Sequence, residues 1–143
     1  MKNSSSNQPI VVNDAQTFIQ IDMDIASYVL AICNHLDLAF GSIEITMLSK
    51  DAIEKMNHQY FQHPTPTDTI SFNLTPDDLI TGDIYICPEI IQENTTTYTT
   101  SFEQELKTVL IHSILHLMGY TDDTEATYLE MKNLQETIYQ NLL

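Results

Sequence analysis

The chain has 143 residues, of which 43% are hydrophobic, so its length and composition are those of one globular domain rather than a disordered protein. It carries 20 acidic residues, five lysines and no arginine, for a formal net charge of −15. Nucleic-acid binding usually depends on clustered lysine and arginine side chains that neutralise phosphates, so the composition argues against tight capture of RNA or DNA by the protein alone.

The N-terminal residues 1–8 are polar and lack the apolar run of a secretory signal, and no apolar segment approaches the ~20 residues that span a bilayer. Cys33 and Cys87 lie in apolar stretches and form no CxxC pair, which is typical of buried, reduced thiols. We therefore expect a cytoplasmic protein without a membrane partner. A single domain should cover residues 1–143, with a flexible N-terminus at 1–8.

The first half of the chain alternates between predicted strands and helices. Residues 10–12 are a β-rich run that predicts an opening strand, and a helix capped by Asp22 follows, because apolar residues recur at helical spacing after it. Residues 43–48 alternate between apolar and polar side chains, which predicts a strand with one wetter face. Ser49 can cap a second helix over residues 50–61. Its predicted inward positions are Ile53, Met56 and Tyr60.

Two further strands are predicted at 69–72 and 83–87, the second opening after Gly82. A short helix after Pro88 leads to a predicted loop through the threonines at 95–100. Ser101 can cap a long helix that is apolar almost all round, and a final helix covers residues 122–143. The inward positions of the final helix are Tyr128, Met131, Leu134 and Ile138. The pattern predicts an α+β fold with one mixed sheet of about four strands packed against helices, the long helix central and buried.

The long helix carries His112 and His116, whose spacing places both imidazoles on one face, within reach of one metal ion at ~2.0–2.1 Å. Gly119 favours a left-handed end to the helix, after which the chain can bring Asp122 back as a third ligand. Asp122 could instead cap the next helix, or Asp123 could cap it and leave Asp122 free. Three protein ligands leave a coordination position for water, as in catalytic zinc sites.

A metal ion with an open position lowers the pKa of bound water to about 7, so the pattern predicts metal-assisted hydrolysis. One zinc ion is expected, and the carboxylate ligand makes manganese or another divalent metal more competitive. Zinc peptidases with a two-histidine helix place a glutamate base directly after the first histidine. Ser113 occupies that position, which argues against a peptidase.

Three ordered motifs resemble the YbeY family of bacterial ribosomal RNA maturation factors, a group of metal-dependent endoribonucleases. Residues 112–122 are similar to its His-Gly-x-Leu-His-Leu-x-Gly-Tyr-Asp-His signature, with Asp122 in place of the last histidine. Residues 56–60 and 66–72 resemble its Leu-Asn-x2-Tyr and Pro-Thr-Asp-Val-Leu-Ser-Phe segments, and residues 82–86 resemble Gly-Asp-Ile-x-Ile. The resemblance covers roughly residues 40 to 135.

The resemblance implies an endoribonuclease that acts on single-stranded RNA in ribosomal RNA maturation. Its partners would be ribosomal RNA or the small ribosomal subunit, with no DNA. His112, His116 and Asp122 would hold the metal, and metal-bound water would be the reactive group. Phe61 stands where the family has an arginine, which removes a guanidinium suited to a phosphate. Lysines or His63 could replace it only as weaker point charges.

Several residues near the predicted cleft allow two interpretations. Thr67, Asp68 and Ser71 are expected to shape the turn beside the cleft, with direct substrate contact as the alternative. Asp83 could lie in a turn or orient a ligand histidine, and His63 is a weak catalytic candidate. No general base follows from the sequence. The main rival function is a non-catalytic ribosome-assembly factor with a structural metal, because the acidic chain could dock onto basic ribosomal proteins. A zinc peptidase is the third possibility.

Overall fold

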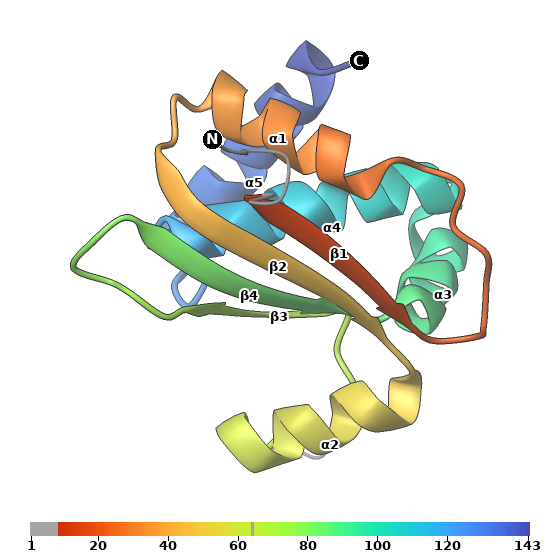
Figure 1. Cartoon of the computed structure of the whole chain (residues 1–143). Helices are drawn as coiled ribbons and strands as arrows, with labels where there is room; N and C mark the ends of the chain where they lie inside the picture. The colour runs from red at the N-terminus through yellow and green to blue at the C-terminus, as the bar shows by residue number, and fades with distance from the viewer. Residues whose placement is uncertain (1–8, 64) are drawn as a thin grey trace, which may run out of the picture.

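The computed structural model describes residues 9–63 and 65–143 (Figure 1). It shows an α+β fold with one four-stranded mixed sheet and helices, as the sequence predicts. The segment 1–8, predicted to be flexible, lies outside the described residues. Within the described ranges, no helix combines the length and the apolar character needed to cross a membrane.

The strands of the sheet lie in the order β1–β2–β4–β3. β1 (Ile10–Ala15), β2 (Phe40–Leu48) and β4 (Ile80–Ile86) run parallel to one another, and β3 (Thr69–Asn73) pairs antiparallel with β4 at the edge. β4 therefore has a parallel neighbour on one side and an antiparallel one on the other. β3 packs against the helix that carries the histidines, where the Thr69 hydroxyl lies 2.8 Å from the Ser113 hydroxyl.

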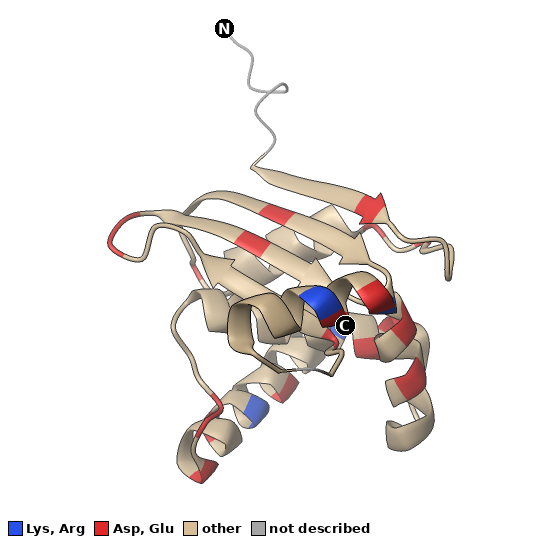
Figure 2. Cartoon of the chain, turned by 90° about the horizontal axis from the view of Figure 1, so that it is seen from below, with Lys and Arg blue, Asp and Glu red and all other residues tan. Residues whose placement is uncertain are grey.

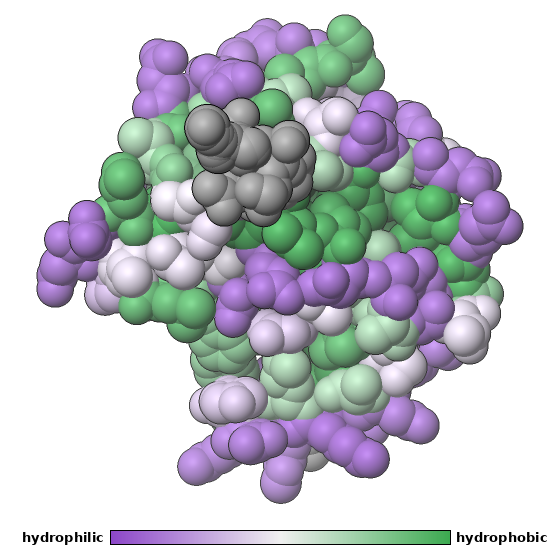
Figure 3. Space-filling model, viewed as in Figure 1, coloured by the Kyte–Doolittle hydropathy of each residue, from purple (hydrophilic) through white to green (hydrophobic). Residues whose placement is uncertain are grey.

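Four helices cover one face of the sheet, and one helix lies on the other face (Figure 1). The covering helices are α1 (Ile25–His35), α3 (Pro88–Tyr98), α4 (Phe102–Leu117) and α5 (Glu125–Asn141), with α4 in contact with each of the others. α2 (Lys50–Phe61) lies below the sheet, with a hydrophilic outer surface at the bottom of Figure 3.

α4 is the central buried helix that the sequence predicts. Its side chains Leu106, Leu110, Ile111, Ile114 and Leu115 have no exposed surface and pack with the inward residues of the parallel strands. Complete burial of such a side chain contributes about 1.5–3 kcal/mol, so α4 is firmly held in place. Functional side chains on this helix consequently have a rigid support.

Alternation along β2 and β4 separates the two faces of the sheet. Ile45 and Ile84 point into the core, whereas Glu44 and Asp83 are neighbours on the opposite face, which α2 covers only in part. Figure 2 views this opposite face and shows acidic positions far outnumbering basic ones. The wetter side predicted for residues 43–48 is thus confirmed.

Buried cysteines are also confirmed, since Cys33 and Cys87 are both free and fully buried. Burial raises the pKa of the Cys33 thiol to about 11, so the group stays protonated at neutral pH.

Several predicted boundaries are wrong. Asp24 rather than Asp22 caps α1, accepting a hydrogen bond from the Ser27 amide at 3.1 Å. β4 begins two residues before Gly82, because inward-facing Ile80 continues its alternation. The threonine segment is not all loop, since α3 extends to Tyr98. Thr95 is tolerated in that helix because its hydroxyl donates to the Gln92 carbonyl oxygen at 2.6 Å.

Two tyrosines predicted to point inward are exposed. Tyr60 in α2 has 58% of its surface exposed, while the polar Asn57 is buried and donates to the Thr65 carbonyl oxygen at 2.8 Å. Tyr128 in α5 is 50% exposed, although Met131 and Ile138 on the same helix are buried as predicted. Both tyrosines lie at the edge of an apolar stripe, where a helix begins to turn away from the core.

Candidate metal centre

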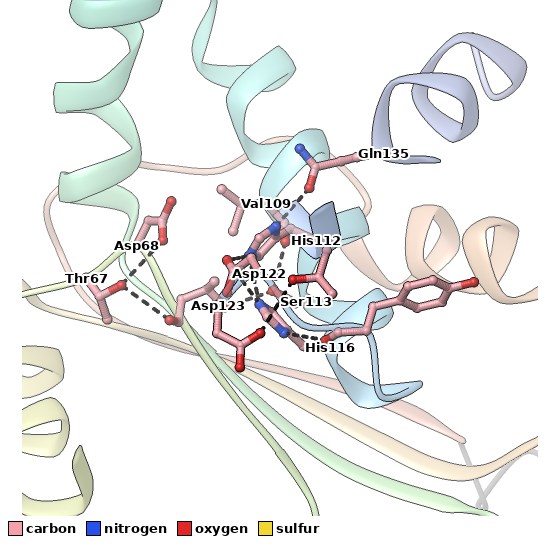
Figure 4. A network of polar contacts seen from close by, with 12 residues as sticks. Thr67, Asp68, Val109, His112, Ser113, His116, Asp122, Asp123 and Gln135 are labelled. Carbon is pink, nitrogen blue, oxygen red and sulfur yellow. Dashed lines mark hydrogen bonds and ion pairs between the residues drawn. The ribbon is translucent and has the colours of Figure 1, made fainter. Parts of the chain in front are cut away.

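The C-terminal half of α4 presents two imidazoles that face each other at the edge of the core. The Nε2 atoms of His112 and His116 are 2.9 Å apart, and a carboxylate oxygen of Asp122 lies 3.7 Å and 3.9 Å from them, respectively (Figure 4). These three residues could hold one metal ion with one atom each. The histidine side chains are 28% exposed and that of Asp122 is 44% exposed, so the centre is accessible from solvent.

Hydrogen bonds on the far side of each ring determine which nitrogen faces the centre. Nδ1 of His116 lies 3.0 Å from the carbonyl oxygen of Tyr120, which can only accept, so Nδ1 carries the proton and donates. Nδ1 of His112 lies 2.9 Å from Oε1 of Gln135 and donates to it in the same way. In the neutral rings both Nε2 atoms then carry a lone pair and no proton, and they lie only 2.9 Å apart. A cation between them would relieve this contact.

The spacing of the three donor atoms fits a zinc-sized ion. Two nitrogens that bind one tetrahedral zinc at ~2.05 Å lie roughly 3.3 Å apart, so the atoms need move by only a few tenths of an ångström. Burial and the neighbouring His112 lower the pKa of His116, which keeps its ring in the neutral form that binds metal. The donor set of two imidazoles and one carboxylate suits zinc, and manganese as well.

The turn after α4 brings the chain back to the histidines. The amide of Gly119 donates to the His116 carbonyl oxygen and the amide of Tyr120 donates to that of Leu115, which is the pattern of a Schellman helix end. Gly119 has a φ of +101°, where a side chain is strained. This turn places the Tyr120 carbonyl oxygen next to Nδ1 of His116 and directs the Asp122 carboxylate toward both rings.

The next helix is capped by neither aspartate. Thr124 caps α5, with its hydroxyl accepting from the Thr127 amide at 3.1 Å and the Thr127 hydroxyl accepting in return from the Thr124 amide. Asp122 is therefore free to face the imidazoles, and the alternative that it caps the helix is wrong. Asp123 makes only a 3.4 Å contact with the Thr127 hydroxyl.

Two clefts open beside the centre, and both are lined by His112, Asp122 and Asp68. The first has a volume of about 470 Å³ and extends along β3 to the end of α2, including Phe61. The second has a volume of about 410 Å³ and lies between α3, α4 and α5, including Lys132. The predicted ligands thus lie where the two clefts meet.

The other predicted site residues fall in different places. Thr67, Asp68 and Ser71 all line the first cleft, and Thr67 and Asp68 lie in the loop before β3, to one side of the histidines (Figure 4). His63 is exposed and lines neither cleft. Asp83 lies within β4 on the opposite face of the sheet and orients no histidine; burial and Glu44 raise its pKa.

Sequence reasoning missed the residues that orient the rings. Gln135 lies 23 positions after His112 and on another helix, so no local pattern points to it.

Ser113 is fully buried, and its hydroxyl donates to the Val109 carbonyl oxygen and contacts the Thr69 hydroxyl. Its position in the peptidase pattern is therefore occupied by a group that faces β3 rather than the centre.

These features define the class of α+β proteins that carry a candidate two-histidine, one-carboxylate metal centre at the end of a buried helix. The family model described as Endoribonuclease YbeY matches residues 2–143. The chain belongs to the endoribonuclease YbeY family, as its three motifs predict.

Curated relatives agree with this assignment. A protein named Endoribonuclease YbeY from Christiangramia forsetii is 42% identical over 96 residues, which are 67% of this chain and 67% of that protein. Its namesake from Thermotoga petrophila is 41% identical over 83 residues, 58% of this chain and 55% of that protein. The second match therefore spans little more than half of the relative. These names confirm that the family is one of hydrolases that cleave RNA.

The solution structure of TM1509 from Thermotoga maritima has a similar fold. It superposes with a TM-score of 0.58 at 25% sequence identity, and the match covers 93% of this chain and 91% of that one.

Proposed function

We propose that this protein is a metal-dependent endoribonuclease that hydrolyses phosphodiester bonds of single-stranded RNA. The observation that carries the proposal is the convergence of His112, His116 and Asp122 beside two clefts in a chain of the endoribonuclease YbeY family. We propose further that residues 1–143 act as one domain, in the cytoplasm, in the maturation of ribosomal RNA on the small ribosomal subunit.

His112, His116 and Asp122 would hold one divalent ion, zinc or alternatively manganese. The bound ion would supply a Lewis acid and lower the pKa of water at its open position. Gln135 and the Tyr120 carbonyl keep the two imidazoles in the tautomer that offers Nε2. The chain thus contributes a preorganised set of ligands rather than one assembled on binding.

Asp68 is our candidate for the proton acceptor. Apart from Asp122, it is the only carboxylate among the residues that line the first cleft, and it lines the second cleft as well. Its contact with the Thr67 hydroxyl is long, at 3.5 Å, so the carboxylate keeps acceptor capacity for an attacking water. A carboxylate in this position could take the proton as the bond to phosphorus forms.

The proposal is tested by comparing the wild-type protein with His116→Ala on labelled single-stranded ribosomal RNA and on a peptide pool. Metal content and thermal stability are measured on the same samples, because loss of a ligand can also unfold a protein. His58→Ala is the matched control, since His58 is exposed and lines neither cleft. We expect RNA cleavage that is lost with the metal in His116→Ala and kept in the control. A folded, metal-loaded wild type that leaves RNA intact would refute the proposal.

A ribosome-assembly factor with a structural metal is the second candidate, and the net charge of −15 favours it. An acidic surface attracts basic ribosomal proteins more readily than RNA. Ribosome association that survives His116→Ala, together with intact RNA in all samples, would support this alternative. The peptidase is disfavoured further because Ser113 is buried and hydrogen-bonded away from the centre.

A further inference from the structure

Phe61 forms an aromatic platform at the rim of the first cleft. It is the last residue of α2, lines the cleft, and has 46% of its surface exposed. One face of its ring stacks on Phe72 of β3, with centroids 5.9 Å apart and planes 9° from parallel. The open face of the ring is therefore the one available to the cleft.

The orientation of this platform is set before any ligand binds. Phe72 is itself fixed by edge contacts with Tyr60 and Tyr85, at centroid distances of 5.4 Å and 6.2 Å. Phe72 also packs in the apolar cluster around Ile53 and Ile70 between α2 and the sheet. A ring held in this way loses little conformational entropy when another ring stacks on it.

The cleft offers few charges to a phosphate backbone. Among the described residues, no lysine lines the first cleft, and Lys132 is the single lysine that lines the second. The chain has no arginine, and acidic positions far outnumber basic ones along it (Figure 2). Neutralisation of phosphates by side chains can therefore contribute little to holding an RNA strand.

We propose that an unpaired base of the RNA substrate stacks on the open face of Phe61, so that aromatic stacking holds the strand beside the metal centre. The inference rests on the proposed function, and it names the side chain that selects for single-stranded RNA. Bases in a duplex already stack on one another and cannot cover Phe61. Stacking tolerates any base because every base has a π-face, so this contact would not read sequence.

The test uses the zinc-loaded full chain and a single-stranded oligoribonucleotide that contains 2-aminopurine and a phosphorothioate backbone to slow hydrolysis. Binding is followed by anisotropy, and stacking by quenching of the 2-aminopurine fluorescence. Phe61→Leu keeps an apolar side chain over Phe72 but removes the platform, and Phe61→Trp keeps an aromatic face. Phe18→Leu is the matched control, because Phe18 is similarly exposed, at 51%, and lines neither cleft.

Loss of the platform should weaken binding by roughly 5- to 150-fold, the range for one base–aromatic stack. We expect Phe61→Leu to show this loss together with reduced quenching, while Phe61→Trp and Phe18→Leu remain close to wild type. The salt dependence of wild-type binding should be shallow, with a log–log slope of about −0.7 or less in magnitude for a single lysine contact.

The inference fails if Phe61→Leu binds and quenches as wild type does, or if Phe18→Leu loses as much as Phe61→Leu. Cleavage of unmodified RNA is measured separately, so the two proposals can fail independently. Metal-dependent cleavage with no effect of Phe61→Leu would leave the proposed function standing and overturn the platform. Stacking on Phe61 without cleavage of RNA would leave the platform standing and overturn the proposed function.

Discussion

Oε1 of Gln135 lies 2.9 Å from Nδ1 of His112, although the two residues belong to different helices. The amide oxygen accepts the ring proton, and this bond fixes the tautomer that turns Nε2 toward Asp122. The tautomer of His116 is fixed in the same way, by a hydrogen bond from its Nδ1 to the backbone carbonyl of Tyr120. One ligand therefore depends on a side chain that can be substituted, and the other on a turn.

Replacement of Gln135 by leucine should weaken zinc binding by about 10- to 100-fold, the range for loss of a partner that orients a metal ligand. Thermal stability should change little, because Gln135 is only half-buried. Competition with a chromophoric chelator measures the affinity, and Gln140→Leu, on the exposed side of the same helix, serves as the control. An unchanged zinc affinity in Gln135→Leu would show that the hydrogen bond does not orient His112.

Gly119→Ala should lower the free energy of unfolding by about 1–2 kcal/mol, because a β-carbon is strained at the φ of +101°. No atom beyond Gly119 and its two chain neighbours lies within 4 Å of the added carbon, so the cost is one of backbone conformation alone. Zinc affinity should fall too, since the turn positions the Tyr120 carbonyl. Denaturant unfolding is the measurement. Gly41→Ala, where the new carbon meets only ordinary contacts, should have a smaller effect.

Asp68→Asn should lower kcat for RNA cleavage by about 10²- to 10⁴-fold if this carboxylate accepts the proton, the usual contribution of a general base. Its zinc content should match that of the wild type, because Asp68 is not among the three converging ligands. Single-turnover cleavage with parallel metal analysis separates the two effects. Full activity in Asp68→Asn would remove this residue from the mechanism.

Asp83→Asn should stabilise the protein at neutral pH. Burial and the adjacent Glu44 raise the pKa of Asp83 above 3.8, so the folded state binds the proton more tightly than the unfolded state does. The stability linked to this proton is present below the unfolded pKa and is lost as the pH rises through the folded pKa. The asparagine variant should therefore gain over wild type at pH 7 and lose that advantage near pH 3.

Thermal unfolding across this pH range tests the linkage. Asp77→Asn, at an exposed loop position, is the control for loss of a carboxylate from the surface. A gain for Asp83→Asn that is equal at both ends of the range would contradict the assignment.

Local patterns were sufficient for much of the fold and for the candidate ligands. The spacing of His112 and His116, and the glycine that ends their helix, are properties of consecutive residues, so they survive without knowledge of the tertiary structure. The burial of α4 followed from its uniform apolarity. Whether Asp122 faces the histidines depended on whether Asp122 or Asp123 caps the next helix. Neither does, because Thr124 caps it through reciprocal hydrogen bonds with Thr127.

Contacts between segments that are distant in the sequence could not be predicted from local patterns. Gln135 meets His112 only because α5 packs on α4, and Asp83 faces away from the histidines only because its strand is oriented by Ile84 beside it. Helical spacing placed Tyr60 and Tyr128 inward, yet both lie where the helix surface leaves the core. A periodic pattern gives the centre of an apolar stripe better than its edges, and both tyrosines lie at such an edge.

The three candidate ligands come from α4 and the turn after it, and the group that orients His112 comes from α5. An ion at the centre would therefore join the end of one helix to the segment that starts the next, and through Gln135 to the middle of α5. Packing of the C-terminal helix and ion occupancy would be thermodynamically linked. Backbone amides of α5 should then exchange hydrogen for deuterium more slowly when the protein is loaded with zinc than after chelation.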